Sequence, residues 1–243
     1  MPGLPPPPFA LLDGAALFLD FDGTLVELAE TPDSIRVAPE LEALLHRLMR
    51  RLDGRLAIVS GRSLADLERH VPLSGIAFSG SHGLELRLPD GTSLPLSVPI
   101  GLDDVHERVR RFAAGRSGLL VEEKPAGIAL HYRLAPAEAD AADAFMAAVA
   151  AERGWTLQRG NKVVELRPTG ATKGDALRAF MTEPDFAGAR PVFVGDDLTD
   201  EHGFGAAAQL GGAGVLVGRA RKTAAAYRLE SVGAVAAWLG GMT

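Results

Sequence analysis

The sequence predicts an α/β protein with a doubly wound parallel-sheet core, residues 1–99 and 168–243, and a smaller α+β domain, residues 100–167, inserted into that core. Three observations predict this architecture. Short apolar runs alternate with amphipathic segments at both ends of the chain, which is typical of parallel strands joined by helices. Between them the order helix, strand, strand occurs twice, which favours two helices packed on an antiparallel sheet. Polar residues directly follow several apolar runs, as at the carboxyl edge of a parallel sheet.

The first predicted strand ends in two aspartates. An apolar run over 15–19 is followed by Asp20, Asp22, Gly23 and Thr24, with a phenylalanine between the aspartates. Because side chains at i and i+2 of a strand share a face, we expect the two carboxylates to converge and to share a proton or a cation. Gly23 permits a sharp exit, and Thr24 offers a hydroxyl and an N–H to an anion. An ordinary Asp-Gly turn would contain the same short motif, so other strand ends must decide.

The remaining core segments continue the alternation of strands and helices. We expect helices over 39–52, 64–70, 172–181 and from about 199, strands over 56–59, 76–78, 191–194 and 213–217, a hairpin over 85–97, and a closing segment at 235–239.

Two of these strands also end in polar residues. Ser60 and Gly61 follow one, and Asp196 and Asp197 follow another. Ligands of open α/β sheets bind outside the carboxyl ends of strands, so acidic and hydroxyl groups at these ends together indicate a site. Lys173, at the start of a helix, could add the cation that a phosphate site needs, although a lone helix lysine is more often solvated.

The inserted segment is predicted to contain helices over 102–114 and 138–150 and strands over 119–122, 128–132, 155–158 and 163–166. Glu122, Lys124, Arg133 and Glu165 lie at or beside these strands. Exposed sheet faces are routinely polar, so the positions of these four residues do not by themselves indicate a ligand.

The bulk composition excludes several classes of protein. The formal net charge is −6 and no basic run stands out, which argues against nucleic acid as a partner. The chain has no cysteine, so neither a disulfide framework nor a thiolate metal site is expected. The proline-rich start lacks lysine and arginine, and no apolar run approaches the ~20 residues that span a bilayer, so we expect neither a signal peptide nor a membrane segment. The expectation is a cytoplasmic monomer with a small-molecule substrate.

Four segments, taken in order, carry a resemblance to a known superfamily. DFDGTL from Asp20, SGR from Ser60, TKGDAL from Thr172 and VGDDLTDE from Val194 are similar to the four motifs of the haloacid dehalogenase (HAD) superfamily. That resemblance implies a Rossmann-like core and a phosphatase that forms an aspartyl-phosphate. Its implied metal is Mg²⁺, held by Asp20, the backbone carbonyl of Asp22, and Asp196.

The same resemblance implies a role for each motif residue. Asp20 would be the nucleophile, and Asp22 the general acid and then the general base. The phosphoryl oxygens would be bound by Thr24, Ser60, Gly61 and Lys173. Asp197 and Asp200 would support the metal from behind its ligands or orient Lys173.

A closer resemblance covers the inserted domain. The segments 80–85 (GSHGLE), 121–124 (VEEK) with 131–133 (HYR), and 163–168 (VVELRP) are similar to characteristic segments of trehalose-6-phosphate phosphatases. The resemblance implies that the inserted domain is a cap that recognises substrate. The substrate-binding residues that it implies are Arg62, His82, Glu122, Lys124, Arg133, Asn161 and Glu165.

One position departs from that family. A lysine often follows the glycine directly, whereas here Asn161 follows Gly160 and the lysine is Lys162. Since a shift of one residue in a strand reverses the face, we expect Asn161 to replace the lysine as a weaker polar contact.

These patterns predict a Mg²⁺-dependent trehalose-6-phosphate phosphatase. Three alternatives stay open: another sugar phosphatase of the superfamily, such as one for sucrose 6-phosphate or mannosyl-3-phosphoglycerate; a phosphotransferase that excludes water; and a non-catalytic sugar-phosphate sensor. The intact Asp20, Asp22, Lys173 and Asp196 argue against the sensor, because a protein that only binds needs neither a nucleophile nor a general acid.

Overall fold

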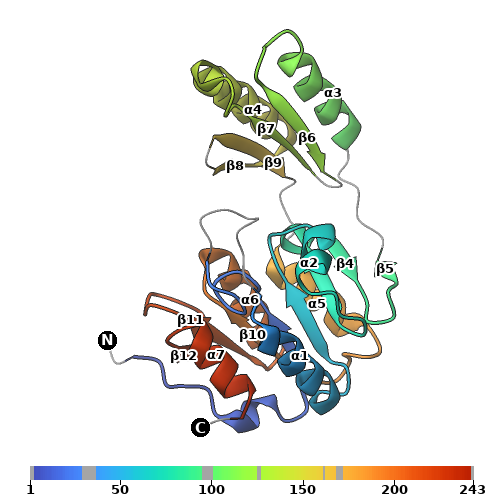
Figure 1. The fold of residues 1–243 in the computed structure, drawn as a ribbon, viewed down its shortest axis with the longest axis vertical. Helices are drawn as coiled ribbons and strands as arrows, with labels where there is room; N and C mark the ends of the chain where they lie inside the picture. The colour runs from blue at the N-terminus through green and yellow to red at the C-terminus, as the bar shows by residue number, and fades with distance from the viewer. Residues whose placement is uncertain are drawn as a thin grey trace. The chain divides into compact units, whose positions relative to one another are not determined.

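The computed structural model describes residues 3–28, 37–94, 101–124, 127–160, 162–167 and 172–241. The chain forms two compact units: the core unit, Met1–Pro95 with Ala171–Thr243, and the insert unit, Leu96–Gly170 (Figure 1). The predicted insert, residues 100–167, lies within the second of them.

An eight-stranded sheet forms the centre of the core unit, in the order β12-β11-β10-β1-β2-β3-β4-β5. The six strands from β12 to β3 in this order are parallel to one another. At the edge, β4 pairs antiparallel with β3, and β5 pairs antiparallel with β4. The fold class is therefore the mixed α/β class that the sequence predicted. The strands are β1 Ala15–Leu19, β2 Leu56–Val59, β3 Ala77–Gly80, β4 Glu85–Arg87, β5 Ser93–Leu94, β10 Arg190–Gly195, β11 Ala213–Val217 and β12 Tyr227–Leu229.

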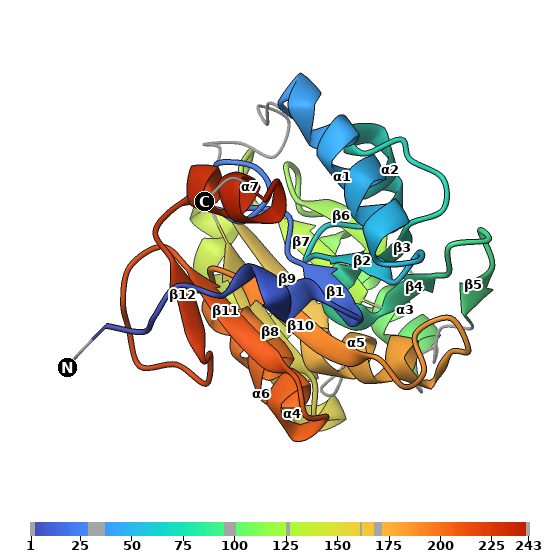
Figure 2. The same cartoon turned by 90° about the horizontal axis from the view of Figure 1, so that it is seen from below.

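Helices cover both faces of this sheet (Figure 2). On one face lie α1 (Pro39–Arg51), α2 (Leu64–His70) and α7 (Val232–Leu239), and on the other α5 (Lys173–Thr182) and α6 (Glu201–Gln209). Alternate residues of each strand serve the two layers. In β1, Leu17 packs in the cluster under α1 and α7, whereas Phe18 packs in the cluster under α5 and α6. Burial of both faces explains why the strands are continuous apolar runs.

The insert unit is a four-stranded antiparallel sheet in the order β6-β7-β9-β8. Its apolar side chains pack beneath α3 (Leu102–Ala113) and α4 (Ala139–Arg153), both on the same face of the sheet (Figure 1). We call the other side of the sheet the open face. The strands are β6 Leu120–Lys124, β7 Gly127–His131, β8 Thr156–Gly160 and β9 Val163–Arg167.

Most element boundaries differ from the predicted ones by one to three residues. The 3-10 helix η1 (Phe9–Leu12) and the three-residue strand β12 were not predicted, because segments this short have too few residues to show a periodicity. The closing segment belongs to α7, which begins after the N-cap Ser231. In the described ranges, no helix is both long and apolar enough to cross a lipid bilayer.

Candidate active site

Three neighbouring parallel strands deliver the predicted strand-end residues to one edge of the core sheet. Asp20 follows β1, Ser60 follows β2 and Asp196 follows β10, and β1 lies between the other two. The backbone N–H of Asp20 donates to the carbonyl of Val194 at 2.9 Å, which anchors Asp20 to the end of β10. Because the strands are parallel, their carboxyl ends lie together, and so do the three side chains.

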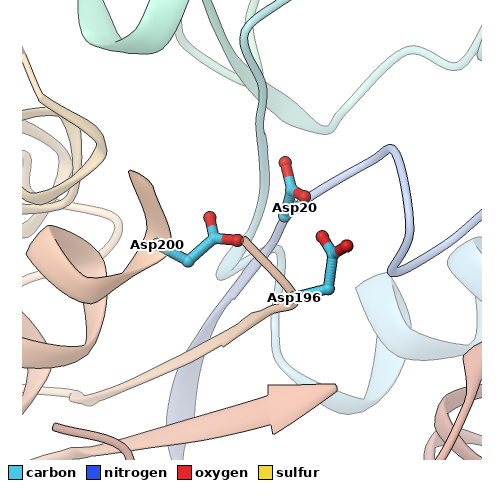
Figure 3. A group of neighbouring side chains, drawn as sticks. All are labelled: Asp20, Asp196 and Asp200. Carbon is cyan, nitrogen blue, oxygen red and sulfur yellow. The ribbon is translucent and has the colours of Figure 1, made fainter. Parts of the chain in front are cut away.

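Three carboxylates gather at this edge. Oxygen atoms of Asp20, Asp196 and Asp200 all lie within 4.8 Å of one another, and Figure 3 shows Asp200 directed toward the other two. Asp200 ends the 3-10 turn η5 (Leu198–Asp200), where its Oδ2 accepts the N–H of Asp197 at 2.9 Å. Gly195 makes this approach possible, because an added Cβ there would lie 2.3 Å from Cγ of Asp200.

Lys173 joins two of these carboxylates. Its Nζ donates to Oδ1 of Asp20 at 2.7 Å and to Oδ1 of Asp200 at 2.6 Å, and the whole residue is 3% exposed. Local sequence places it there: Thr172 caps α5 by accepting the N–H of Asp175, so that Lys173 is the first residue of the helix. Asp200 therefore contacts Lys173 directly, as its predicted role of orienting this lysine requires.

Burial and charge act against each other in the pKa values of this group. Burial lowers the pKa of Lys173, but attraction to Asp20 and Asp200 outweighs it and raises that pKa, so the ammonium form persists. Burial raises the pKa of Asp20 well above its ordinary value, and the charge of Lys173 offsets this only in part. Burial and the nearby Asp200 raise the pKa of Asp196 to about 6.

The donor set fits a hard divalent cation. The single ammonium of Lys173 cannot neutralise three ionised carboxylates, so ionisation of all three leaves a net negative charge for a cation to balance. Oδ1 of Asp196 is buried and accepts no hydrogen bond from any residue described here. Gly23, with φ of +77°, leaves room beside this carboxylate, since an added Cβ would lie 2.2 Å from its Oδ2. Carboxylate oxygens with an unused acceptor are what Mg²⁺ and Ca²⁺ bind in proteins.

Contrary to the prediction, the side chain of Asp22 lies outside the carboxylate cluster. Its two oxygens accept from Arg62, Oδ2 from Nε at 2.7 Å and Oδ1 from Nη2 at 2.9 Å. The prediction that Asp20 and Asp22 share a cation or a proton through their side chains is wrong. Strand β1 ends at Leu19, so the two-residue periodicity of a strand no longer applies at Asp22. Arg62 pairs with acidic neighbours instead, Asp22 and Asp66.

The hydroxyl groups predicted to bind phosphate lie in the same unit. Ser60 is 1% exposed, and its Oγ accepts the N–H of Arg62 at 3.2 Å. Thr24 is fully buried, and its Oγ1 has no hydrogen-bond partner within the described segments. A buried hydroxyl without a partner is unusual and indicates a group that awaits a ligand or water.

A strained turn places His82 beside Ser60 and Gly61. Ser81 and His82 adopt φ of 48° and 57°, a left-handed conformation that costs a non-glycine residue about 1 kcal/mol or more. The N–H of His82 donates to the carbonyl of Ser60 at 2.9 Å, and the imidazole packs on Gly61, where an added Cβ would lie 2.6 Å from Nε2. Gly83 lies against the carbonyl of Thr172, so the turn links the end of β2 to the start of α5.

The polar residues predicted in the insert lie on and beside the open face. Glu122 and Glu165 flank Ala129 in one row of the sheet. Nζ of Lys124 donates to Oε2 of Glu165 at 2.7 Å, and Oε2 of Glu122 is 2.8 Å from Nε2 of His131.

Two other predicted positions lie outside the sheet itself. Arg133 is exposed beyond the end of β7, and Asn161 lies outside the described residues. Lys162 has φ of 62° in the turn between β8 and β9. The argument that a one-residue shift reverses its strand face is therefore wrong for Lys162, because the residue is not in a strand.

Two polar residues near these groups were not singled out from the sequence. Asp66 pairs with Arg62, and both the four-residue spacing and the capping pattern from Ser63 to Asp66 could have indicated it. Arg167 follows Glu165 by two residues on the open face, and burial lowers its pKa. Its Nε is buried with no acceptor among the residues that the structure describes.

Comparison with known proteins identifies the family of this chain. The family model for trehalose-phosphatase matches residues 18–232. A probable trehalose-phosphate phosphatase of Sinorhizobium fredii is 41% identical over 85% of this chain and 79% of its own length. The trehalose-6-phosphate phosphatase of Escherichia coli is 38% identical over 92% of this chain and 85% of its own.

Solved structures show the same fold. A trehalose-6-phosphate phosphatase related protein superposes with a TM-score of 0.71 at 25% identity, over 93% of this chain and 96% of that one. The C-terminal domain of the Candida albicans trehalose-6-phosphate phosphatase superposes with a TM-score of 0.72 at 24% identity, over 98% of both chains. With a family match over most of its length and relatives near 40% identity, the chain belongs to the trehalose-phosphatase family.

Proposed function

We propose that this protein hydrolyses trehalose 6-phosphate to trehalose and inorganic phosphate with the help of Mg²⁺. The observation that carries the proposal is the buried Lys173, which bridges Asp20 and Asp200 beside Asp196 in a member of this family. A carboxylate nucleophile, a cation and further carboxylates at one sheet edge are the parts that phosphoryl transfer through an aspartyl-phosphate needs.

Asp20 acts as the nucleophile. Its Oδ1 is bound to Lys173, so Oδ2 attacks phosphorus, and the bond from phosphorus to the sugar oxygen breaks. Asp22 donates a proton to the departing sugar oxygen. It then takes a proton from a water molecule, whose oxygen attacks phosphorus and releases Asp20 and inorganic phosphate. At the end of this cycle Asp20 is again a free carboxylate, and Asp22 again carries the proton that it donated in the first step.

Asp20, Asp196 and the backbone carbonyl of Asp22 would hold Mg²⁺, with Asp197 and Asp200 supporting the group. When bound, the ion offsets the repulsion between the Asp20 carboxylate and the phosphate dianion. The family and the three clustered carboxylates support a metal ion, and magnesium is proposed because it prefers hard oxygen ligands beside phosphate.

The phosphoryl oxygens bind Lys173 and the polar groups around it. The Thr24 hydroxyl, the Ser60 hydroxyl and the Gly61 N–H are proposed as hydrogen-bond donors. The unpartnered Oγ1 of Thr24 supports this role, since a bound phosphoryl oxygen would give that hydroxyl an acceptor.

The sugar is recognised by polar side chains that the family resemblance implies. On the insert unit, Glu122, Lys124 and Glu165 present charged groups on the open face, which suits hydroxyl groups of a disaccharide. Further contacts are proposed for Arg62, His82, Arg133 and Asn161.

Phosphate release from a panel of sugar phosphates tests this function. The panel contains trehalose 6-phosphate, sucrose 6-phosphate, mannosyl-3-phosphoglycerate and glucose 6-phosphate, each with Mg²⁺ and with EDTA. We expect the highest kcat/KM for trehalose 6-phosphate and loss of activity in EDTA. A higher kcat/KM for another sugar would reassign the substrate, and binding without phosphate release would favour a sensor.

A further inference from the structure

The guanidinium of Arg62 lies between two carboxylates. Nε and Nη2 donate to the two oxygens of Asp22 at 2.7 and 2.9 Å, while Nη1 donates to Oδ2 of Asp66 at 2.5 Å. The side chains of Arg62, Asp66 and Asp22 are 12%, 17% and 30% exposed, so solvent screens these ion pairs only in part. A two-pronged pairing of this kind fixes the orientation of a carboxylate as well as attracting it.

Asp66 is itself held by its helix. It occupies the first turn of α2, where the hydroxyl of the N-cap Ser63 accepts its N–H at 3.2 Å. Its Oδ1 accepts from Arg69 at 2.6 Å, which leaves Oδ2 to Arg62. Burial alone would raise the pKa of Asp66, but hydrogen bonds and attraction from Arg62 hold that pKa below its ordinary value, so the group stays charged.

We propose that Asp66 is a positioning residue for the proton-transfer step: it orients Arg62, which in turn fixes the carboxylate of Asp22. This inference rests on the proposed role of Asp22 as general acid and base. Each carboxylate oxygen has a second lone-pair direction, so Asp22 can bind Arg62 and still exchange a proton with the sugar oxygen or with water. Asp66 acts through Arg62 rather than as a proton donor.

The leaving group provides a direct test of this role. A sugar hydroxyl is a weak acid, so its oxygen must receive a proton as the bond to phosphorus breaks. p-Nitrophenolate is stable as an anion and leaves without a proton. Misplacing Asp22 should therefore slow the first chemical step for trehalose 6-phosphate and leave that step for p-nitrophenyl phosphate almost unchanged.

The experiment measures single-turnover cleavage, with enzyme in excess, of both esters by wild-type, D66N, D66A and R69A proteins loaded with Mg²⁺. For trehalose 6-phosphate we expect D66A to be about 10- to 100-fold slower than wild type, with D66N between them. For p-nitrophenyl phosphate we expect changes below about threefold. R69A removes the other, exposed arginine partner of Asp66 and is the matched control, expected within about twofold for both esters.

The ratio of the two rates does not depend on how much of a variant is folded, so it decides the question even if D66A is unstable. An unchanged ratio, whether both rates fall together or neither falls, would overturn the proposal. A wild-type protein that cleaves glucose 6-phosphate but not trehalose 6-phosphate would refute the proposed substrate instead. The ratio of glucose 6-phosphate to aryl ester cleavage would then decide the role of Asp66.

Discussion

The core site and the open face of the insert sheet both carry paired acidic and basic side chains, but in opposite surroundings. In the core, the side chains of Lys173 and Asp20 are 3% and 5% exposed. On the insert, those of Glu122 and His131 are 53% and 37% exposed. The first pair joins residues 153 positions apart in the chain, and the second joins neighbouring strands of one small sheet.

This difference in burial suits the two groups of charges to different roles. The side chains of Lys173, Asp20 and Asp200 are almost completely buried, so little solvent competes for their ion pairs. Their geometry is therefore set before substrate arrives, as electrostatic catalysis requires. Exposed pairs contribute about 0–1 kcal/mol each to stability and can exchange a partner for a sugar hydroxyl at little cost. We therefore expect substitutions in the buried cluster of Asp20, Lys173 and Asp200 to affect every substrate, and substitutions on the open face to affect selectivity.

Replacing the nucleophile should have the largest effect. The D20N variant keeps the shape of the side chain but loses the charge that attacks phosphorus, so turnover should fall to background on all phosphate esters. Wild-type enzyme quenched in acid should retain labelled phosphate on the protein, and the variant should not. A variant that retains more than about one hundredth of the wild-type kcat, a loss under ~2.7 kcal/mol, would contradict the nucleophilic role.

Removal of the buried ammonium group of Lys173 should have the next largest effect, a loss of free energy of unfolding. Without metal, K173M leaves Asp20 and Asp200 facing each other unpaired, and we expect it to lower the free energy of unfolding by about 3–5 kcal/mol. R178M on the same helix breaks an exposed pair with Asp175 and should cost less than about 1 kcal/mol. Urea unfolding in EDTA compares the two variants. Equal losses would show that burial does not distinguish these ion pairs.

On the open face, the expected effect is smaller and selective. A charged hydrogen bond is worth about 1.5–3 kcal/mol, so E122A should lower kcat/KM for trehalose 6-phosphate by roughly 10- to 150-fold and leave p-nitrophenyl phosphate nearly unchanged. The control is E123A, which changes the next residue of β6, whose side chain pairs with Arg110 instead. Equal losses on both substrates would make Glu122 structural or catalytic, and no loss would remove it from the sugar site.

The smallest expected effect is a pH-dependent change in the melting temperature of the metal-free protein. Because the pKa of Asp196 is about 6 in the folded state, above the ordinary value of 3.8, its contribution to stability is present at low pH and is lost as pH rises through 6. The D196N variant should therefore melt a few degrees higher than wild type at pH 8 in EDTA, with little difference at pH 4. Thermal melts at both pH values, with the exposed D185N as control, measure this.

Added Mg²⁺ should reverse the order at pH 8, because binding stabilises the wild-type protein more than a variant that lacks one of its ligands. A D196N protein that is less stable than wild type at pH 8 in EDTA would contradict the raised pKa. An equal response of both proteins to Mg²⁺ would remove Asp196 from the metal site.

Local patterns in the sequence determined the two-part α/β architecture and the edge of the core sheet where the polar residues gather. Periodicities of 2 and 3.6 residues arise within a few turns of chain, and the parallel order follows from short connections. Asp20, Ser60, Lys173 and Asp196 could be found in this way, because each directly follows a strand or begins a helix.

Which charges pair was decided only by the tertiary structure. Asp22 binds Arg62, 40 positions away, and Lys173 reaches both Asp20 and Asp200. Such pairs depend on where a strand stops, how closely two helices approach and which side chains lose their water. These are properties of the packed chain, and no local window of sequence contains them. The same physical reason separated Asp22 from the carboxylate cluster. Asp66 pairs locally with Arg62, four residues before it, but only the tertiary contact of Arg62 with Asp22 makes Asp66 a neighbour of the site.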